Sequence, residues 1–112
     1  MNDKTVFDPV QAQLDAYNAR DVDAFVRCFA PNIICEDGDG KRLFVGNAMM
    51  RARYSVLFAE SPNLHCELKQ RMRAGEFVAD EIDVTSRDGE IVRAIVVYHV
   101  KGSVISHIRF LR

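Results

Sequence analysis

The most constraining feature of the sequence is a long apolar stretch near its end. Residues 91–100 are rich in β-branched and aromatic side chains and are too apolar for a strand with one face in water. Such a composition is typical of a central strand that is buried on both faces. Lys101 and Gly102 then predict a tight turn, and residues 104–111 predict a second strand beside the first. The rest of the chain must cover this hairpin.

The length and composition of the chain limit the class of protein. A chain of 112 residues is expected to form one domain, here residues 9–112 after a flexible N-terminal tail of residues 1–8. The net charge of −1 gives no electrostatic basis for binding nucleic acid or a membrane surface. The three cysteines have no CxxC spacing, and neither a signal peptide nor a membrane span is apparent. We therefore expect a cytoplasmic protein with reduced thiols.

The first half of the chain predicts helices and a short hairpin. Asp8 followed by Pro9 is typical of a helix start, Asp21 can cap a second helix, and Gly46 with Asn47 opens a third. Helices are expected over residues 9–19, 22–30 and 47–61, and two strands over residues 33–37 and 43–45.

From residue 64 the pattern changes from helical to alternating. Turns at Gly75 and Gly89 divide this part, together with the apolar hairpin, into four antiparallel strands. Helices followed by such a meander predict an α+β fold, in which three helices cover one face of a curved antiparallel sheet of about six strands.

The pairing of the strands predicts which side chains share the covered face. We assume two-residue turns, which place Arg87 opposite Glu90 and Val100 opposite Ser103. The covered face then carries the apolar side of the first meander strand together with Gln70, Glu81, Asp83, His107 and Arg109. Charged groups there must be paired, hydrated or reserved for a ligand, because an unpaired buried charge is costly. This arrangement predicts a polar internal pocket.

The opposite face of the sheet is predicted to carry an apolar patch ringed by charge. Its members are Ile82, Val84, Ile95, Val97, Ile108 and Phe110. No further segment of the chain remains to cover this patch, so we expect a homodimer that packs sheet against sheet.

Several motifs follow one another in a recognisable order. The Tyr-Asn-Ala-Arg-Asp motif at residues 17–21 precedes a short helix, the Phe-Ala-Pro motif at residues 29–31, a strand that ends in Glu36-Asp37, and Gly46 before another helix. From about Pro9 to Leu111 this order resembles the nuclear transport factor 2-like superfamily, and within it the SnoaL-like and ketosteroid-isomerase-like proteins. The resemblance implies a cone-shaped, cystatin-like α+β fold that encloses one pocket, usually in a dimer.

The resemblance to ketosteroid isomerase covers the catalytic positions only in part. Asp37 matches the position of the aspartate base. Gln13 replaces the helical tyrosine of the oxyanion hole, and Tyr98 replaces its protonated aspartate. Glu81 and Asp83 fall at positions that contact the steroid through apolar side chains, so a steroid substrate is disfavoured.

The candidate residues each have a functional and a structural interpretation. Asp37 is either a general base or a turn residue. Glu81 with His107 is either a proton-transferring pair or a buried structural pair. Asp83 with Arg109 is either a structural ion pair or a binding site for a substrate carboxylate.

Three further residues belong to the predicted pocket. Tyr98 is either a hydrogen-bond donor to a ligand or a core residue with a satisfied hydroxyl group. Tyr54 is a pocket or a core residue, and Gln70 lies beside Glu81. No histidine spacing suits a metal, so neither a metal nor another cofactor is expected.

Two functions remain open from the sequence. The first is a SnoaL-like enzyme or binder that uses acid–base chemistry on a small molecule, as in isomerisation, cyclisation, dehydration or hydrolysis. The second is a non-catalytic ligand-binding or dimerisation domain with an internal ion-pair network. An open cavity with unpaired acids would favour the first, and a collapsed, fully paired interior would favour the second.

Overall fold

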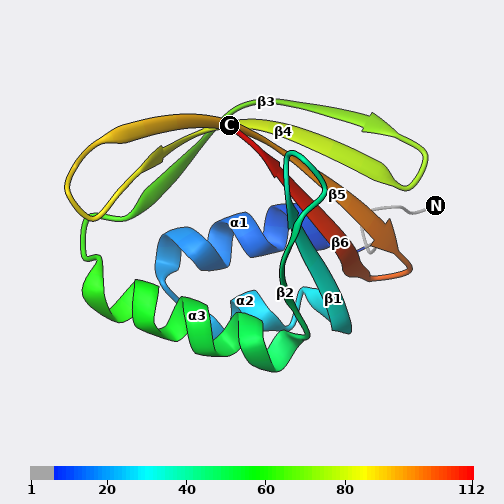
Figure 1. The fold of residues 1–112 in the computed structure, drawn as a ribbon, viewed down its shortest axis with the longest axis horizontal. Coiled ribbons are helices and arrows are strands. Elements are labelled where there is room, and N and C mark those ends of the chain that lie inside the picture. The colour runs from blue at the N-terminus through cyan, green and yellow to red at the C-terminus, as the bar shows by residue number, and fades with distance from the viewer. Residues whose placement is uncertain (1–6) are drawn as a thin grey trace.

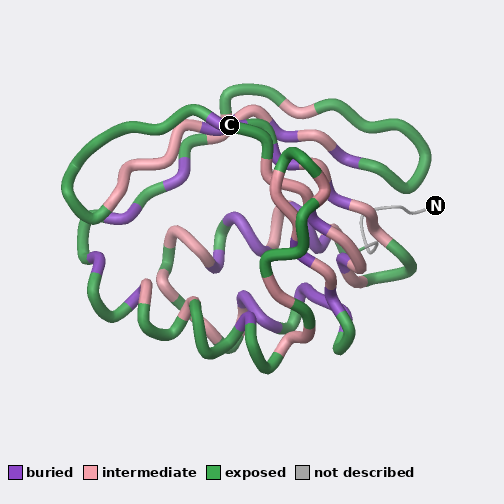
Figure 2. Tube along the Cα trace, viewed as in Figure 1, coloured by how far each residue is buried: buried purple, intermediate pink, exposed green. Residues whose placement is uncertain are grey.

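The computed structural model describes residues 7–112, so most of the predicted tail of residues 1–8 lies outside the described residues. A strongly curved sheet arches over a layer of helices (Figure 1). Figure 2 shows that the buried parts of the chain are concentrated where the sheet and the helices face one another. None of the helices described is long and apolar enough to cross a membrane.

The helical layer consists of α1 (Pro9–Ala19), α2 (Val22–Val26) and α3 (Asn47–Glu60). The predicted start of α1 is confirmed, because the Asp8 carboxylate accepts hydrogen bonds from the backbone N–H groups of Val10 and Gln11 at 3.1 and 3.4 Å. The second helix is shorter than predicted. It ends at Val26 because Phe29 already begins a strand and pairs with Ile105.

The sheet has six strands in the order β2-β1-β6-β5-β4-β3. Their bounds are β1 (Phe29–Asp37), β2 (Arg42–Val45), β3 (His65–Ala74), β4 (Phe77–Thr85), β5 (Ile91–Lys101) and β6 (Val104–Leu111). The predicted antiparallel meander of β3 to β6 is confirmed, whereas β1 and β6 pair in parallel. The α+β class is therefore confirmed, with a sheet that is mixed.

β5 is an inner strand, yet only one of its faces is buried. Ala94, Val96 and Tyr98 are buried on the side of the helices, whereas Ile95 on the other side is 45% exposed. The prediction that this strand is buried on both faces is therefore wrong for the single chain. The helices lie on one side of the sheet only (Figure 1).

The turn between β4 and β5 is one residue longer than the sequence analysis assumed. Ser86 pairs with Glu90, its N–H donating to the Glu90 carbonyl at 2.8 Å, and three residues lie between them. Gly89 has a φ of +87°, which suits the glycine of a three-residue hairpin turn. A shift of one residue moves every side chain of a strand to the other face. As a result, Glu81 and Asp83 point outward.

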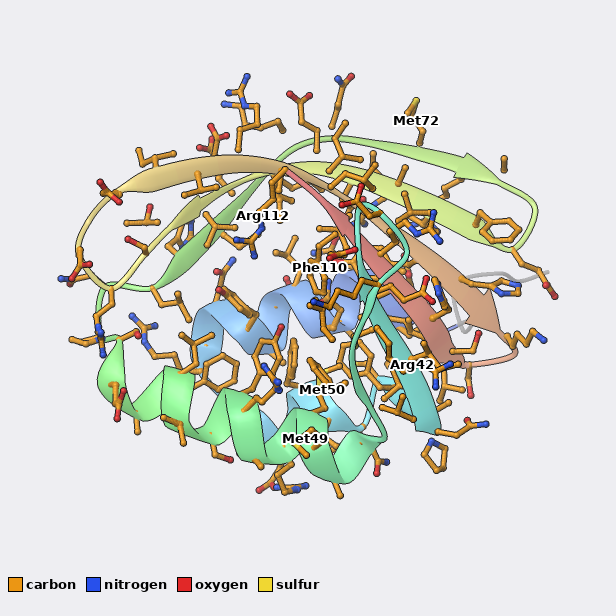
Figure 3. All side chains as sticks on the ribbon, in the orientation of Figure 1. Arg42, Met49, Met50, Met72, Phe110 and Arg112 are labelled. Atoms are coloured by element: carbon orange, nitrogen blue, oxygen red, sulfur yellow. The ribbon has the colours of Figure 1, made fainter. Side chains whose placement is uncertain are left out.

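Two irregularities in strand pairing likewise turn side chains of β3 and β6 to the opposite face of the sheet. In the hairpin of β5 and β6, Lys101 pairs with Val104, and the pairing shifts by one further residue between His99 and Val100, so that Val96 pairs with Phe110 instead of His107. The pairing of β3 with β4 shifts between Leu68 and Gln70. After these shifts, the predicted inward residues Gln70, Met72, His107 and Arg109 lie on the outer face of the sheet. Figure 3 shows Met72 pointing away from the helices.

The predicted dimer patch is divided between the two faces. Ile82 and Ile108 are buried, and Val84 and Phe110 face a cavity under the sheet. Only Ile95 and Val97 remain on the outer face, where they lie beside Leu111 and Arg109 of β6. The composition predicted for the patch is therefore wrong, while dimerisation itself stays a prediction.

Candidate functional site

A cavity of about 270 Å³ lies between the helices and the inner face of the sheet. Most of its lining is apolar or aromatic and includes Phe25, Phe29, Ile82, Val96 and Phe110. In Figure 3 the Phe110 side chain lies in this space under the sheet. The predicted polar pocket is thus wrong, because the shifts in strand pairing turn its expected charged residues outward and large apolar residues inward.

One carboxylate lines the cavity among the residues that the structure describes. It belongs to Asp80, whose side chain is 1% exposed. Arg71 of β3 holds both oxygens with hydrogen bonds of 2.6 Å from Nε and 2.8 Å from Nη2. A third bond of 2.8 Å, from Nη1 to the side-chain oxygen of Gln11, connects the pair to α1. The hydrogen bond to Asp80 raises the pKa of Arg71, so the guanidinium group stays charged.

Tyr98 supplies a hydroxyl group to the same cavity. The side-chain nitrogen of Gln13 donates to the Val10 carbonyl at 3.0 Å and to Tyr98 Oη at 3.1 Å, which fixes both side chains. Burial, and secondarily the charge of Asp80, raise the pKa of Tyr98 well above its ordinary value. The hydroxyl group therefore stays protonated. Within residues 7–112 no acceptor takes its proton, so the group can donate a hydrogen bond to a ligand.

A second set of polar groups lines the same cavity. It contains Tyr17 and Tyr54, whose rings lie edge to face with centroids 6.4 Å apart, together with Ser86 and Arg112. Burial raises the pKa of Tyr54 to about 12, so its hydroxyl group is neutral. Cys66 also lines the cavity, and burial raises the pKa of its thiol to about 11, which makes it a poor nucleophile.

The predicted catalytic residues lie outside this cavity. Asp37 has the geometry of a turn residue, because its carboxylate accepts the N–H groups of Asp39 and Lys41 at 3.0 and 2.9 Å. The expected pair of Glu81 and His107 does not form. His107 Nε2 lies 2.8 Å from a carboxylate oxygen of Glu36.

The predicted substrate-binding residues are divided between the cavity and the outer face. Tyr54 and Tyr98 line the cavity, as the pocket interpretation requires. Gln70 donates to Glu81 at 2.7 Å on the outer face. Asp83 binds Arg93 at 2.8 and 3.1 Å and is not paired with Arg109.

Arg109 belongs to a separate outer network. It donates to Glu36 at 3.1 Å, and together with His107 it lowers the pKa of that carboxyl group. The predicted charged site residues on the outer face are therefore paired with neighbours on that face. The residues that the sequence analysis missed are Arg71 and Asp80, and the pattern that could have revealed Asp80 is the alternation of Val78, Ile82 and Val84 around it.

Comparison with known proteins places this geometry in a family context. The chain matches the model of the SnoaL-like domain over residues 10–108. A protein with a cystatin fold from Novosphingobium aromaticivorans shares 28% identity, with a TM-score of 0.84 over 93% of this chain and 95% of that chain. None of the curated proteins compared with the chain matches it.

Two more distant structures carry functional names. A candidate polyketide cyclase from Sinorhizobium meliloti is 21% identical, with a TM-score of 0.79 over 98% of this chain and 99% of that chain. A candidate ketosteroid isomerase from Kribbella flavida is 20% identical, with a TM-score of 0.73 over 92% and 73%. At these identities the two structures show that the fold is shared.

Proposed function

Because the chain belongs to the SnoaL-like family, we propose that its cavity binds a small, largely apolar molecule with a carbonyl group and catalyses proton transfer of the isomerase or cyclase type. The observation that carries this proposal is the Tyr98 hydroxyl group. It accepts a hydrogen bond from Gln13, keeps its own proton available, and lines the same cavity as the buried carboxylate of Asp80.

The size and lining of the cavity define the ligand class. A volume of about 270 Å³ is slightly below the roughly 300–1,000 Å³ typical of ligand pockets, so the ligand is small. The apolar and aromatic walls favour the ring system or short chain of a small molecule. Glu81 and Asp83 face outward and do not line the cavity, so the volume of the cavity, rather than these charges, limits the size of the ligand.

The chemistry follows from the charge that develops when a proton leaves the carbon next to a carbonyl group. The carbonyl oxygen then becomes an enolate oxygen, which a hydrogen bond from Tyr98 stabilises. Gln13 polarises the Tyr98 hydroxyl group and strengthens that bond. Asp80 is the proton acceptor, because a carboxylate oxygen has a second lone pair beside the one bound by Arg71. Return of the proton to another carbon gives an isomer.

Binding through Tyr98 can be tested with a neutral bicyclic ketone, 2-acetylnaphthalene labelled with ¹³C at its carbonyl carbon. In the wild-type protein we expect the carbonyl signal to move downfield on binding, as it does when a carbonyl oxygen accepts a hydrogen bond. Tyr98→Phe should remove this shift, whereas Tyr54→Phe, which removes the hydroxyl oxygen of another tyrosine in the cavity lining, should retain it. An unchanged shift in Tyr98→Phe would contradict the assigned role.

Proton transfer can be followed with the same ketone as deuterium exchange into its methyl group in D₂O. We expect the wild-type protein to accelerate exchange over buffer, and Asp80→Asn to abolish the acceleration. Glu81→Gln is the matched control, because it changes the neighbouring carboxylate that faces outward. If the wild-type protein binds the ketone without accelerating exchange, the catalytic part of the proposal fails and the binding part stands.

The alternative of a non-catalytic binder is favoured by one observation. Arg71 holds both oxygens of Asp80, which weakens this carboxylate as a base. An open cavity is nevertheless present, so the collapsed interior expected for a purely structural domain is absent from the described residues. The exchange experiment distinguishes the two functions.

We also propose that the outer face of the sheet forms a homodimer interface around Ile95. Ile95→Asp places a charge on this face and is expected to shift the protein to a monomer in sedimentation velocity experiments. Val56→Asp is the control, because Val56 is an exposed apolar residue on α3, away from the sheet. A dimer that withstands Ile95→Asp would contradict this interface.

A further inference from the structure

The cavity has a positively charged group that the proposed proton transfer does not use. Arg112 follows β6, and its side chain lies under the sheet among the residues that line the cavity (Figure 3). β6 ends opposite Ile95 of β5, so the first residues of β5 have no partner on this side. Arg112 therefore lies just beyond the end of β6, beside the part of β5 that pairs with β4 alone.

The guanidinium group of Arg112 has no acidic partner in residues 7–112. Four arginines of the strands form ion pairs: Arg71 with Asp80, Arg73 with Asp8, Arg93 with Asp83, and Arg109 with Glu36. Burial raises the pKa of both Tyr17 and Tyr54, while the charge of Arg112 acts in the opposite direction, which indicates that it lies near both rings. Arg112 is exposed, so water also reaches its guanidinium group, and it lies at a solvent-accessible side of the cavity. A cation there, beside aromatic walls and without a carboxylate partner, is free to bind an anionic group of a ligand.

Ser86 adds an independent observation in the same cavity. Its hydroxyl oxygen is buried and has no hydrogen-bond partner among the described residues. Buried hydroxyl groups in folded proteins are usually satisfied, so an orphaned one that lines a cavity indicates a missing polar partner.

We propose that Arg112 binds a carboxylate or similar anionic group of the ligand, with the Ser86 hydroxyl group as a further donor in the same cavity. This inference rests on the proposed function and narrows it. The ligand class becomes a small oxo-acid with an apolar body, whose carbonyl group lies near Tyr98 and whose anionic group lies near Arg112. The apolar walls between these residues hold the body of the molecule.

The test compares two probes that differ only in charge, 2-naphthoate and 2-naphthamide. The chain contains no tryptophan, so the fluorescence of the naphthalene ring reports binding with little protein background. In the wild-type protein we expect 2-naphthoate to bind at least about tenfold more tightly than the amide, as one charge-assisted hydrogen-bonded pair provides. The NMR signal of the Ala94 methyl group, which lines the cavity, shows whether each probe is inside.

Two arginine variants show whether the preference comes from Arg112. Arg112→Gln should lose the preference for the acid and keep the affinity for the amide. Arg109→Gln removes the same charge from the outer face of the same segment and should keep the preference. A preference that persists in Arg112→Gln would overturn the inference.

The failure of the inference is distinguishable from the failure of the proposed function. If the amide enters the cavity of the wild-type protein as tightly as the acid, the anion site is refuted and the small-molecule pocket stands. If neither probe perturbs Ala94 at millimolar concentration, the proposed function is refuted and the inference falls with it.

Discussion

Arg71→Met is expected to lower the free energy of unfolding by about 3–5 kcal/mol, measured by urea denaturation at pH 7. Methionine is similar in length to the aliphatic part of the arginine side chain, so the substitution keeps that packing. It leaves the carboxylate of Asp80 without its partner. That carboxylate is 1% exposed and would have to stay charged in an apolar cavity or take up a proton. Either outcome makes the folded state less favourable relative to the unfolded state.

Arg73→Met is a closely matched control. Arg73 lies two residues further along β3 and also binds an aspartate, Asp8, with a nitrogen–oxygen distance of 2.6 Å. The side chains of Arg73 and Asp8 are 51% and 36% exposed, so solvent screens the pair and the expected loss is about 0–1 kcal/mol. Equal losses in the two variants would show that the Asp80 carboxylate is solvated. The double variant Arg71→Met with Asp80→Leu should recover most of the stability, because no charge remains buried.

The elements of the fold could be predicted from local signals. Asp8 and Asp21 cap the helices as the sequence indicates, because a capping side chain acts on backbone groups two or three residues away. The four meander strands were also found, since alternation and glycine turns are local features. The parallel pairing of β1 with β6 joins segments about 70 residues apart, and no local pattern specifies it.

The facing of the strands could not be predicted by carrying the pairing from one strand to the next. The sequence Arg87-Asp88-Gly89 is compatible with a two-residue or a three-residue turn, and the choice reverses β4. The shift between His99 and Val100 then reverses β6 and has no residue signature. The apolar side of each strand is a better guide, because Ile108 and Phe110 on β6 both face inward.

The hydrogen-bonded pair of Gln13 and Tyr98 was located in part by the resemblance to ketosteroid isomerase. Gln13 and Tyr98 were aligned with two donor positions of ketosteroid isomerase, and the structure brings them into direct contact at 3.1 Å. This alignment used a residue of α1 and a residue of β5, whose facing does not depend on the turns that were misassigned. Arg71 and Asp80 do lie opposite each other as the predicted pairing of β3 with β4 implies, but both were assigned to the outer face. The reasons are the one-residue difference in the pairing of β4 with β5 and the irregularity of β3 between Leu68 and Gln70.

Phe25→Ala is the second substitution expected to have a large effect, with a loss of about 3–5 kcal/mol in the free energy of unfolding. Phe25 is 3% exposed, and its ring centroid lies 4.6 Å from that of Tyr54 and 4.9 Å from that of Phe29. It anchors α2, a helix of 5 residues that is too short to be stable without tertiary contacts. The loss should appear as a lower midpoint in urea denaturation.

Phe77→Ala provides the comparison for the same change of side chain. Phe77 is 50% exposed and stacks on His99 with centroids 4.4 Å apart, so only a modest contact is lost, worth about 1 kcal/mol. Phe25 also lines the cavity, and its removal leaves space for a larger ligand. A three-ring probe such as 2-acetylanthracene should therefore gain affinity relative to 2-acetylnaphthalene in Phe25→Ala but not in Phe77→Ala. Equal stability losses, or an unchanged probe preference in Phe25→Ala, would contradict the assignment of Phe25 to both the core and the cavity wall.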